Sequence, residues 1–569
     1  MEIKDLPWVE RTFGDALLWA SREYGSREAV VYGADRISFT QLADRVRAFA
    51  RGLIAQGIES GEHVALWMAD RPDWLVARWA IPMIGAVLVP VNTRFREKDV
   101  GYVLAQSDAR TLIVQHGAVR GVRYLDILER LEPGLATQPQ GAWQCKEMPE
   151  LRRVIGLQAD ESTPLPDSIT SFAAIEAAGK ALLDDGVLEQ RVASVKPGDV
   201  AQILYTSGTT SFPKGAMVCH GPLLQNNAYA AWCFGFDTKD RYLASVPLFT
   251  ATGTGYTLAL WLSGATMVID SNPYDVHNFC TVIERERITA SFFVDTIVQD
   301  LKGYPARDTH DLSSLRVGYG APLPTASFLW LVNTLGVHDM IGTYGMSETT
   351  NAVSRTRYDD PLDKRAHTNG RPCAGVQVRI VDIDTETALP PGKVGEIRVA
   401  GYTVMPGYYK RPDENAKTFD AEGWLRTGDL GELDADGYLI YRGRVKEMIK
   451  PSGFNVATQE IEEFLQTYPG VRQAVVVGVP DARLGEVAYA YVETLASADV
   501  SAEALIRYCK DNIASYKAPR YVEFVTEWPL TGSQKIKKLE LKTRANATLQ
   551  ALQEQAPAQA PAQPSIPAA

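Results

Sequence analysis

The sequence predicts an α/β protein with a large N-terminal domain of parallel-rich sheets and helices, a β-rich subdomain and a small C-terminal α+β domain. Helical and strand patterns alternate at short intervals from about residue 11 to 114 and again from 200 to 355. Such alternation favours parallel strands with helices on both faces. Short strands separated by turn signals follow at 376–442, and a compact mixture of helices and strands lies beyond 446.

Length indicates more than one domain. The 569 residues exceed what a single hydrophobic core normally fills. We place the N-terminal domain at residues 1–445 and the small domain at 446–545. Residues 546–569 end in repeats of Pro, Ala and Gln, which cannot bury enough apolar surface to fold, so we expect a disordered tail.

The elements of the large domain follow from hydrophobic periodicity. Between 38 and 57, Leu42, Val46 and Phe49 fall on one helical face, and Gly57 marks its end. The same reasoning predicts helices at 11–25, 72–83 and 97–106, and strands at 63–68, 87–91 and 111–114. Residues 132–170 lack clear periodicity, and we interpret them as an irregular insertion.

The later elements are short. In the β-rich subdomain we expect strands at 376–382, 395–400 and 437–441. In the small domain we expect helices at 458–467 and 502–514 and strands at 474–479, 488–493 and 521–525. Ser501 precedes the second helix as a predicted N-cap.

Composition narrows the class of protein. A net charge of −11 argues against a nucleic-acid-binding surface, which needs a basic excess. The six cysteines form no Cys-x-x-Cys pair, which suits a reducing cytosol, so we expect a cytoplasmic protein. The charged segment Met1–Asp5 is unlike a signal peptide. Arg78, Pro82 and Gly85 interrupt the apolar stretch 74–90, which favours buried elements over a membrane span.

The stretch Tyr205–Gly215 is a candidate phosphate-binding loop. It follows the apolar run Val200–Leu204, and its hydroxyl groups, glycines and Lys214 can surround phosphate oxygens. A Walker P-loop is excluded, because Pro213 stands at that motif's second glycine and Gly215 at its Ser or Thr. An ordinary surface loop rich in Ser, Thr and Gly is the alternative.

Two further stretches place an acidic residue near a glycine. In Thr343–Thr350, Tyr344 can stack on a purine and Glu348 can bind Mg²⁺. In Gly423–Leu430, Asp429 can accept both hydroxyls of a ribose. An aspartate after a glycine turn is more often an Asx-turn or a helix cap.

Two basic stretches, 441–455 and 531–538, bring the number of candidate functional stretches to five. Taken alone, each is an ordinary solvated strand or loop. The five stretches in this order closely resemble the adenylate-forming superfamily of acyl-CoA synthetases, peptide-synthetase adenylation domains and firefly luciferase. The resemblance extends from about residue 12 to 542. It implies stacked sheets in the large domain, a small mobile C-terminal domain, and a carboxylic acid, ATP, Mg²⁺ and coenzyme A as ligands.

The resemblance also implies roles for individual residues. Lys535 matches the lysine that drives adenylation, Glu348 the magnesium ligand and Lys446 the hinge between the domains. Gly453 and Phe454 match the segment that lines the pantetheine channel of CoA. In the superfamily the small domain rotates about the hinge between the two half-reactions. The residues matched to ATP binding are Thr206, Ser207, Gly208, Thr209, Thr210, Lys214, Gly320, Ala321, Pro322, Thr343, Tyr344, Gly345, Glu348, Thr349, Asp429 and Arg444.

Three positions depart from the superfamily's motifs. Ser211 and Gln534 replace glycines, and Thr250 stands where many acyl-CoA ligases have a histidine or another ring. The gating role of that ring is therefore unassigned here. We expect Thr250, Trp261 and Phe293 to shape an acyl pocket, although the last two also suit an ordinary core.

The substrate class follows from what the sequence omits. Amino-acid-activating relatives hold the substrate's ammonium with an aspartate, and residues 247–256 contain none. No carrier domain follows residue 545. We therefore favour a fatty, alicyclic or aromatic acid.

The resulting hypothesis is an acyl-CoA synthetase that forms an acyl-adenylate and then a CoA thioester. Within the enzymes, the alternative is an adenylate former that passes the acyl group to a carrier-protein thiol or oxidises it as luciferase does. A non-catalytic nucleotide-binding relative is the alternative from another class. The expected partners are small molecules, with no nucleic acid, no membrane span and a homodimer left open.

Overall fold

The computed structural model describes residues 8–159, 164–182, 186–206, 213–272, 274–320, 323–451, 456–481, 483–495, 498–530 and 536–555. The chain forms two compact units, Met1–Thr427 with Gly431–Tyr441, and Gly428–Leu430 with Arg442–Ala569. The second unit therefore begins at Arg442 and takes in three earlier residues, whereas we predicted a single boundary between 445 and 446.

The first unit contains two seven-stranded sheets that are parallel except at one edge. In spatial order, the first sheet is β16 (Asp339–Ile341), β15 (Val317–Tyr319), β14 (Ala290–Phe292), β12 (Arg241–Leu243), β13 (Thr266–Ile269), β1 (Glu28–Tyr32) and β2 (Asp35–Ser38). The second is β11 (Lys214–Cys219), β10 (Val200–Thr206), β4 (Val87–Pro90), β3 (His63–Trp67), β5 (Thr111–His116), β8 (Arg153–Gln158) and β9 (Thr170–Ser171). β2 and β11 are the antiparallel edge strands. The parallel-rich sheets predicted from the alternating pattern are thus confirmed.

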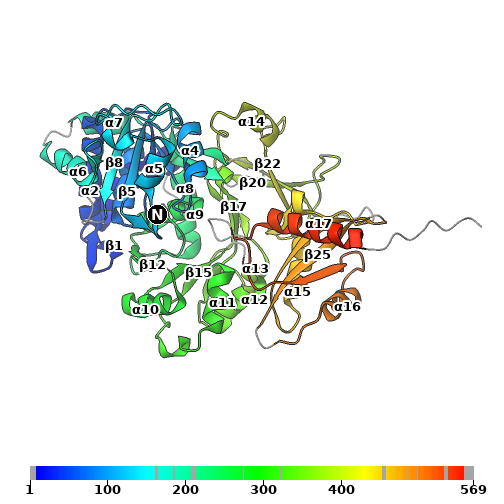
Figure 1. Ribbon diagram of the computed structural model, residues 1–569. Helices are drawn as coiled ribbons and strands as arrows, with labels where there is room; N and C mark the ends of the chain where they lie inside the picture. The colour runs from blue at the N-terminus through cyan, green and yellow to red at the C-terminus, as the bar shows by residue number, and fades with distance from the viewer. Residues whose placement is uncertain are drawn as a thin grey trace, which may run out of the picture. The chain divides into compact units, whose positions relative to one another are not determined.

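Helices cover both sheets and create a layered core (Figure 1). Between the sheets lie α1 (Phe13–Tyr24), α2 (Phe39–Ala55), α3 (Pro72–Met83), α6 (Phe172–Ala181), α7 (Gly186–Ser194), α8 (His220–Phe234) and α9 (Ala251–Ser263). The outer face of the first sheet packs against α10 (Val276–Glu286), α11 (Asp295–Gly303) and α12 (Thr325–Asn333). The outer face of the second packs against α4 (Glu97–Gln106) and α5 (Tyr124–Leu131).

Helix α2 shows why hydrophobic periodicity predicted a helix correctly. The Ser38 hydroxyl accepts a hydrogen bond from the Gln41 N–H at 3.1 Å, and the Gln41 side chain accepts one from the Ser38 N–H at 2.8 Å. This capping box satisfies two backbone donors that the first turn leaves unpaired. The predicted face, including Val46 and Phe49, is fully buried in the central core.

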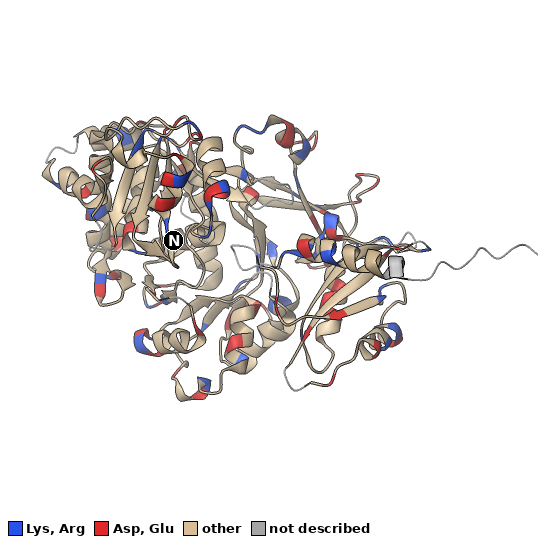
Figure 2. Cartoon of the chain, viewed as in Figure 1, with Lys and Arg blue, Asp and Glu red and all other residues tan. Residues whose placement is uncertain are grey.

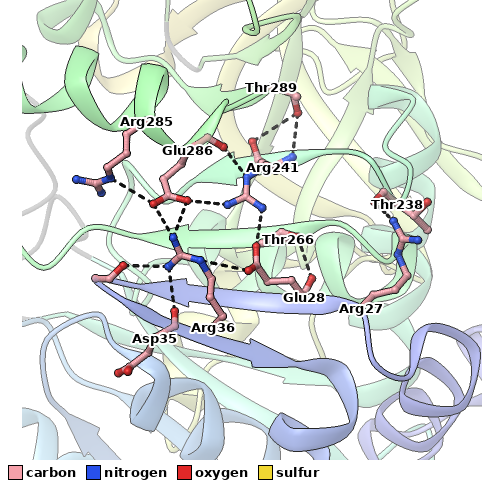
Figure 3. A network of polar contacts seen from close by, with 11 residues as sticks. Arg27, Glu28, Asp35, Arg36, Thr238, Arg241, Thr266, Arg285, Glu286 and Thr289 are labelled. Carbon is pink, nitrogen blue, oxygen red and sulfur yellow. Dashed lines mark hydrogen bonds and ion pairs between the residues drawn. The ribbon is translucent and has the colours of Figure 1, made fainter.

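A charged network ties the N-terminal strands of the first sheet to its centre (Figure 3). Glu286, at the end of α10, pairs with Arg36 of β2 at 3.0 Å and with Arg241 of β12 at 2.8 Å. Arg36 and Arg241 both also pair with Glu28 of β1. Because two carboxylates share two guanidiniums, β1, β2 and β12 are held in register beyond their backbone pairing.

The rest of the first unit is rich in short strands. One sheet contains β17 (Thr343–Met346), β18 (Asn351–Arg355) and β19 (Arg371–Pro372). β20 (Val376–Val381) and β21 (Gly395–Gly401) belong to a four-stranded sheet with β22 (Leu425–Leu433) and β23 (Leu439–Arg444), two strands that also include residues 428–430 and 442–444 of the second unit. The remaining elements are α13 (Leu362–His367), α14 (Pro412–Thr418) and the small hairpin β6 (Ala118–Val119) and β7 (Val122–Arg123). The β-rich subdomain is therefore confirmed.

Among its described residues, the second unit combines three α-helices with a three-stranded sheet. Its elements are α15 (Thr458–Gln466), β24 (Val471–Asp481), β25 (Gly485–Thr494), α16 (Ala502–Asn512), β26 (Tyr521–Phe524) and α17 (Lys538–Gln555). The Ser501 hydroxyl accepts from the Ala504 N–H at 3.2 Å, as the predicted N-cap of α16 requires.

Two expectations about irregular segments were wrong. Residues 132–170 contain β8, which pairs in parallel with β5 along six residues. Its run Arg153–Gln158 has only four buried positions, too few to show a period from sequence. Helix α17 continues to Gln555, although we expected disorder from residue 546. The Leu, Ala and Gln residues before 555 favour helix and outweigh the composition of the Pro-containing end.

Charged residues lie mainly on helices and loops, where Lys and Arg are interspersed with Asp and Glu (Figure 2). The central strands β3 and β4 carry no Asp, Glu, Lys or Arg. Within the described residues, no helix combines the length and apolar character needed to cross a membrane.

Candidate active site

The predicted phosphate loop begins and ends on paired strands in the first unit. Thr206, the last residue of β10, pairs with Lys214, the first residue of β11. Gly215 follows, and a Cβ there would lie 2.6 Å from the Ile203 side chain, so a larger residue would require that side chain to move. The predicted ligands Ser207, Gly208, Thr209 and Thr210, together with the departure at Ser211, lie outside the described residues.

The Lys214 ammonium lies between an acid and an aromatic ring. It forms an ion pair with Glu414 of α14, and it lies 5.2 Å from the centroid of the Tyr408 ring. The hydrogen bond from Lys214 lowers the pKa of the Glu414 carboxyl. These contacts hold the ammonium at the base of the loop.

Tyr408 connects this lysine to the predicted metal ligand. Its hydroxyl donates to Glu348 Oε1 at 2.6 Å, and its backbone forms a bridge with Ala216 of β11. Burial, followed by the charge of Glu348, raises the pKa of the Tyr408 hydroxyl. The phenol therefore stays protonated and keeps donating. Sequence analysis did not identify Tyr408. The signal in the sequence was the glycine- and tyrosine-rich run Gly401–Tyr409.

Glu348 fits the carboxylate that a magnesium–phosphate complex requires. It lies in the 3₁₀ turn Ser347–Thr349 and is 6% exposed. Among the described residues, Oε1 accepts from Tyr408, whereas Oε2 has no hydrogen-bond donor. The described residues also contain no cluster of three His, Cys, Asp or Glu side chains that could hold a metal by themselves. Mg²⁺ usually takes one or two protein carboxylates and completes its shell with phosphates and water.

Tyr344 and its neighbours form a tightly packed strand pair beside this turn. The Tyr344 ring stacks on Tyr441, with centroids 5.6 Å apart and an interplanar angle of 24°. A Cβ at Gly345 would lie 1.9 Å from the Asn351 carbonyl oxygen, so only glycine lets β17 approach β18 here. The Thr349 hydroxyl accepts from the Met346 N–H at 3.0 Å and closes the turn. Thr349 thus has a structural role, and its part in ATP binding stays a prediction.

Two other residues that are predicted to bind ATP, Thr343 and Gly320, lie in contact with backbone carbonyl groups. Thr343 donates its hydroxyl to the Ser354 carbonyl at 3.1 Å, so it holds β17 to β18. A Cβ at Gly320 would lie 2.1 Å from the Phe293 carbonyl oxygen, which makes glycine necessary there. Ala321 and Pro322 lie outside the described residues.

The second unit holds the predicted ribose and hinge residues. The Arg444 Nε atom lies 3.5 Å from Asp429 Oδ1, so these two predicted partners do meet. Lys446 lies in a 3₁₀ turn, Val445–Glu447, immediately after β23. Gly453 and Phe454 lie outside the described residues, and Ile449 and Val456 on either side exchange two backbone hydrogen bonds of 2.9 Å.

The segment around the predicted catalytic lysine is anchored on both sides. Lys535, like Gln534, lies outside the described residues, and a backbone bridge joins Leu530 to Ile536.

Lys538, at the start of α17, pairs with Glu447 at 2.9 Å and with Glu462 of α15 at 2.8 Å. Burial opposes the charge of Lys538, but the two carboxylates outweigh it and raise its pKa. Lys538 is therefore a positioning residue that sequence analysis missed. Its place close to Lys535 and Lys537 in the sequence concealed it.

The three residues expected to shape an acyl pocket have different surroundings. The Thr250 hydroxyl accepts from the Gly253 N–H at 3.0 Å and caps α9. Trp261 lies in the core, where its ring packs on Phe39 and Trp79 and its N–H donates to the Ala16 carbonyl at 3.3 Å.

The cavity beside Trp261 measures about 10 Å³, room for about one water molecule. Phe293 is fully buried against α10, α11 and α12. Both aromatic side chains are therefore core residues in this structure, which favours the ordinary interpretation over a direct role in selecting the acid.

Asp70 is a further residue that the sequence did not reveal. It follows β3, and its carboxylate accepts a hydrogen bond from the Leu248 N–H at 3.1 Å. Leu248 lies three residues after Ser245 and two residues before Thr250. Burial raises its pKa to about 6, although Leu248 and Arg120 act in the opposite direction. Asp70 therefore positions the segment that leads into α9.

This chain matches known proteins along most of its length. A family model described as AMP-binding enzyme matches residues 17–409, and one described as AMP-binding enzyme C-terminal domain matches 460–535. YngI of Bacillus subtilis (strain 168), provisionally named an acyl-CoA synthetase, is 35% identical over 94% of this chain and 97% of its own.

Two other proteins extend the comparison. A Rhodococcus jostii (strain RHA1) protein, named 3-[(3aS,4S,7aS)-7a-methyl-1,5-dioxo-octahydro-1H-inden-4-yl]propanoyl:CoA ligase, is 34% identical over 93% of this chain and 98% of its own. The crystal structure of the anthranilate CoA ligase AuaEII with anthranoyl-AMP has a TM-score of 0.82 and 26% identity, and the match covers 97% of this chain and 100% of that one.

Proposed function

Because this chain belongs to the AMP-binding enzyme family, we propose that it is an acyl-CoA synthetase that converts a carboxylic acid, ATP and CoA into acyl-CoA, AMP and pyrophosphate. The observation that carries the proposal is the contact series Lys214, Tyr408 and Glu348. It joins a lysine at the base of a glycine-containing loop to a carboxylate suited to Mg²⁺. Family membership and this geometry point to the same chemistry.

In the first half-reaction, a substrate carboxylate oxygen bonds to the α-phosphorus of ATP. The bond from that phosphorus to the bridging oxygen breaks, and pyrophosphate leaves with the electron pair. Two anions must approach, and negative charge grows on the leaving group. Fixed cations lower this barrier when they interact more strongly with the transition state than with the ground state. We assign this task to Lys535, with Lys214 and the loop 206–215 binding the departing phosphates.

Glu348 would hold Mg²⁺, which would supply charge neutralisation of the phosphates when bound. The Tyr408 hydroxyl orients the Glu348 carboxylate through Oε1, which leaves the other oxygen for the metal. Tyr344, Asp429 and Arg444 are proposed to hold the nucleoside. These roles follow from the superfamily's motifs.

In the second half-reaction, the CoA thiolate attacks the acyl carbon and AMP leaves. A free thiol has a pKa of about 8.5, so a minor fraction is ionised near neutral pH. We assign Gly453 and Phe454 to the pantetheine channel. The two half-reactions use different residues of the second unit, Lys535 first and the 453–454 segment afterwards.

The substrate is proposed to be a largely apolar carboxylic acid. The protein from Rhodococcus jostii is named for a bicyclic propanoic acid, and AuaEII for an aromatic acid. Residues 247–256 include no carboxylate that could hold an ammonium group. Both facts favour an alicyclic, aromatic or fatty acid over an amino acid.

The test separates the two half-reactions. Acids are screened for ATP–pyrophosphate exchange without CoA, and CoA is then added to measure AMP release and thioester formation. Lys535→Ala should abolish exchange but retain thioester formation from a preformed acyl-adenylate. Exchange without any thioester on adding CoA would favour the carrier-protein alternative, and the absence of exchange with every acid would favour a non-catalytic relative.

A further inference from the structure

Arg355 is a buried arginine at the end of β18 with no carboxylate partner among the described residues. The residue is 4% exposed. Its Nη2 atom donates to Oδ1 of Asn226 on α8 at 2.7 Å, and its Nη1 atom donates to Sγ of Cys373 at 3.3 Å. The Asn226 amide also donates to the Ala352 carbonyl at 2.7 Å, which fixes the oxygen toward the guanidinium. The arginine is therefore held rigidly by two uncharged side chains.

The groups around Arg355 supply no negative charge near neutral pH. Burial raises the pKa of the Cys233 and Cys373 thiols and of the Tyr402 hydroxyl, so all three are protonated. Arginine remains charged in proteins. A buried charge without a counter-ion is unfavourable, and buried charges in proteins are usually paired.

Other polar atoms nearby are also unsatisfied. Within the described residues, the Tyr402 hydroxyl and Oδ1 of Asn227 are buried without a hydrogen-bond partner. Asn227 follows Asn226 on α8, and Tyr402 is close enough for Arg355 to influence its pKa. Arg355 and Tyr402 contribute donors that suit an acceptor oxygen, and Asn227 Oδ1 contributes one acceptor; we call these three groups the Arg355 subsite.

This subsite adjoins the elements that carry the proposed chemistry. Arg355 pairs with Thr343 across β17 and β18, the strand pair that leads to Glu348. Tyr256 of α9, the helix that Thr250 caps, senses the Arg355 charge, and its ring stacks on Tyr319 at 4.2 Å. Tyr319 immediately precedes Gly320. Arg355 therefore lies on β18, is hydrogen-bonded to α8 and is close to α9.

We propose that Arg355, held by Asn226, recognises a second acceptor oxygen that the substrate acid carries at a distance from its reacting carboxyl group. The proposal rests on the acyl-CoA synthetase function above and specifies its substrate class, namely an apolar acid bearing a ketone or a second carboxylate. Guanidinium donors bind such oxygens directionally, and carboxylates in two-point fashion. A site built around a buried donor discriminates against an analogue that lacks the acceptor, because the donor is then left unpaired.

The experiment compares matched acids that differ only in the distal oxygen. One pair is 3-cyclohexylpropanoic acid and 3-(4-oxocyclohexyl)propanoic acid, and one series is decanoic, 9-oxodecanoic and decanedioic acid. The ratio of kcat/KM for pyrophosphate release is measured within each set for the wild-type protein, Arg355→Met and Arg355→Lys. Methionine keeps most of the volume without the charge, and lysine keeps the charge.

In the wild-type protein, we expect at least one oxygen-bearing acid to exceed its plain partner by roughly tenfold or more, which equals about 1.4 kcal/mol. Arg355→Met should remove or reverse this preference, and Arg355→Lys should retain part of it. A wild-type preference for plain acids, or an equal loss for all acids in Arg355→Met, would overturn the proposal while leaving the synthetase function intact. If Arg355→Met fails to fold, the proposal is tested by the kcat/KM ratio of oxygen-bearing to plain acids in the wild-type protein and in Arg355→Lys. Absence of release with every acid would contradict the synthetase function itself.

Discussion

His220 provides a sensitive test of how this fold is stabilised. It begins α8 and is fully buried between the two large sheets. Its Nδ1 atom accepts from the Phe13 N–H at 3.3 Å, and its ring packs edge-on against Phe13 with centroids 5.2 Å apart. Burial, followed by the nearby charge of Arg78, lowers the pKa of this imidazole to about 3. His220 is therefore neutral in the folded protein. We propose the substitution His220→Asn, which preserves an acceptor for the Phe13 N–H.

The magnitude follows from proton linkage. In the unfolded chain the imidazole binds a proton below about pH 6.5, whereas in the folded protein it does so only near pH 3. Between these values the unfolded state holds more protons, so stability increases with pH and falls on acidification. Each pH unit is equivalent to about 1.4 kcal/mol. Acidification from about pH 6.5 to about pH 5 should therefore cost about 2 kcal/mol through this group alone.

Urea unfolding followed by circular dichroism measures this effect in both proteins near pH 7 and near pH 5. His220→Asn should be less stable near pH 7, because asparagine fills less of the space. On acidification the difference between the two proteins should shrink by about 2 kcal/mol, since only the wild-type protein has this imidazole to protonate. Comparing the two proteins removes the contribution of the other titrating groups. Parallel losses of stability would refute the assignment of a buried neutral imidazole.

Three further substitutions test the site. Asp70→Asn should stabilise the fold near neutral pH by up to about 3 kcal/mol, because the carboxyl with pKa about 6 is ionised there at a cost. That gain in stability should vanish as the pH falls toward about 4, where the wild-type carboxyl is protonated. A difference in unfolding free energy between Asp70→Asn and the wild-type protein that stays the same at both pH values, measured by urea unfolding, would contradict this prediction. Lys538→Met leaves Glu447 and Glu462 without their shared cation and should destabilise the second unit by about 3 kcal/mol, seen as faster hydrogen exchange in α15 and α17. Glu348→Gln should lower ATP–pyrophosphate exchange by roughly 10²–10³-fold with little change in unfolding, and normal exchange would exclude it as the metal ligand.

Local physics made much of the fold predictable. The capping box at Ser38 and the apolar face of α2 act within a few residues, so periodicity was sufficient. The prediction failed at β8, whose partner β5 lies about forty residues earlier in the chain. The four consecutive buried positions of β8, residues 154–157, show no alternation between apolar and polar residues, because the strand is buried on both faces. At α17, the propensity of individual residues outweighed the composition of the segment.

The sequence alone determined the family, the order of the motifs and the substrates that those motifs imply. It could do so because phosphate binding, metal binding and close backbone approach each require particular residues at fixed spacing, as the glycines at 320 and 345 illustrate for backbone approach.

Only the tertiary structure decided which side chains meet across long separations in the chain. It brought Tyr408 to Glu348, Lys538 to Glu447 and Arg355 to Asn226, and it placed Trp261 in the core. The physical reason is that a hydrogen bond or ion pair depends on distance and burial after folding. A single tyrosine or arginine in the sequence shows neither the distance to its future partner nor its burial in the folded protein.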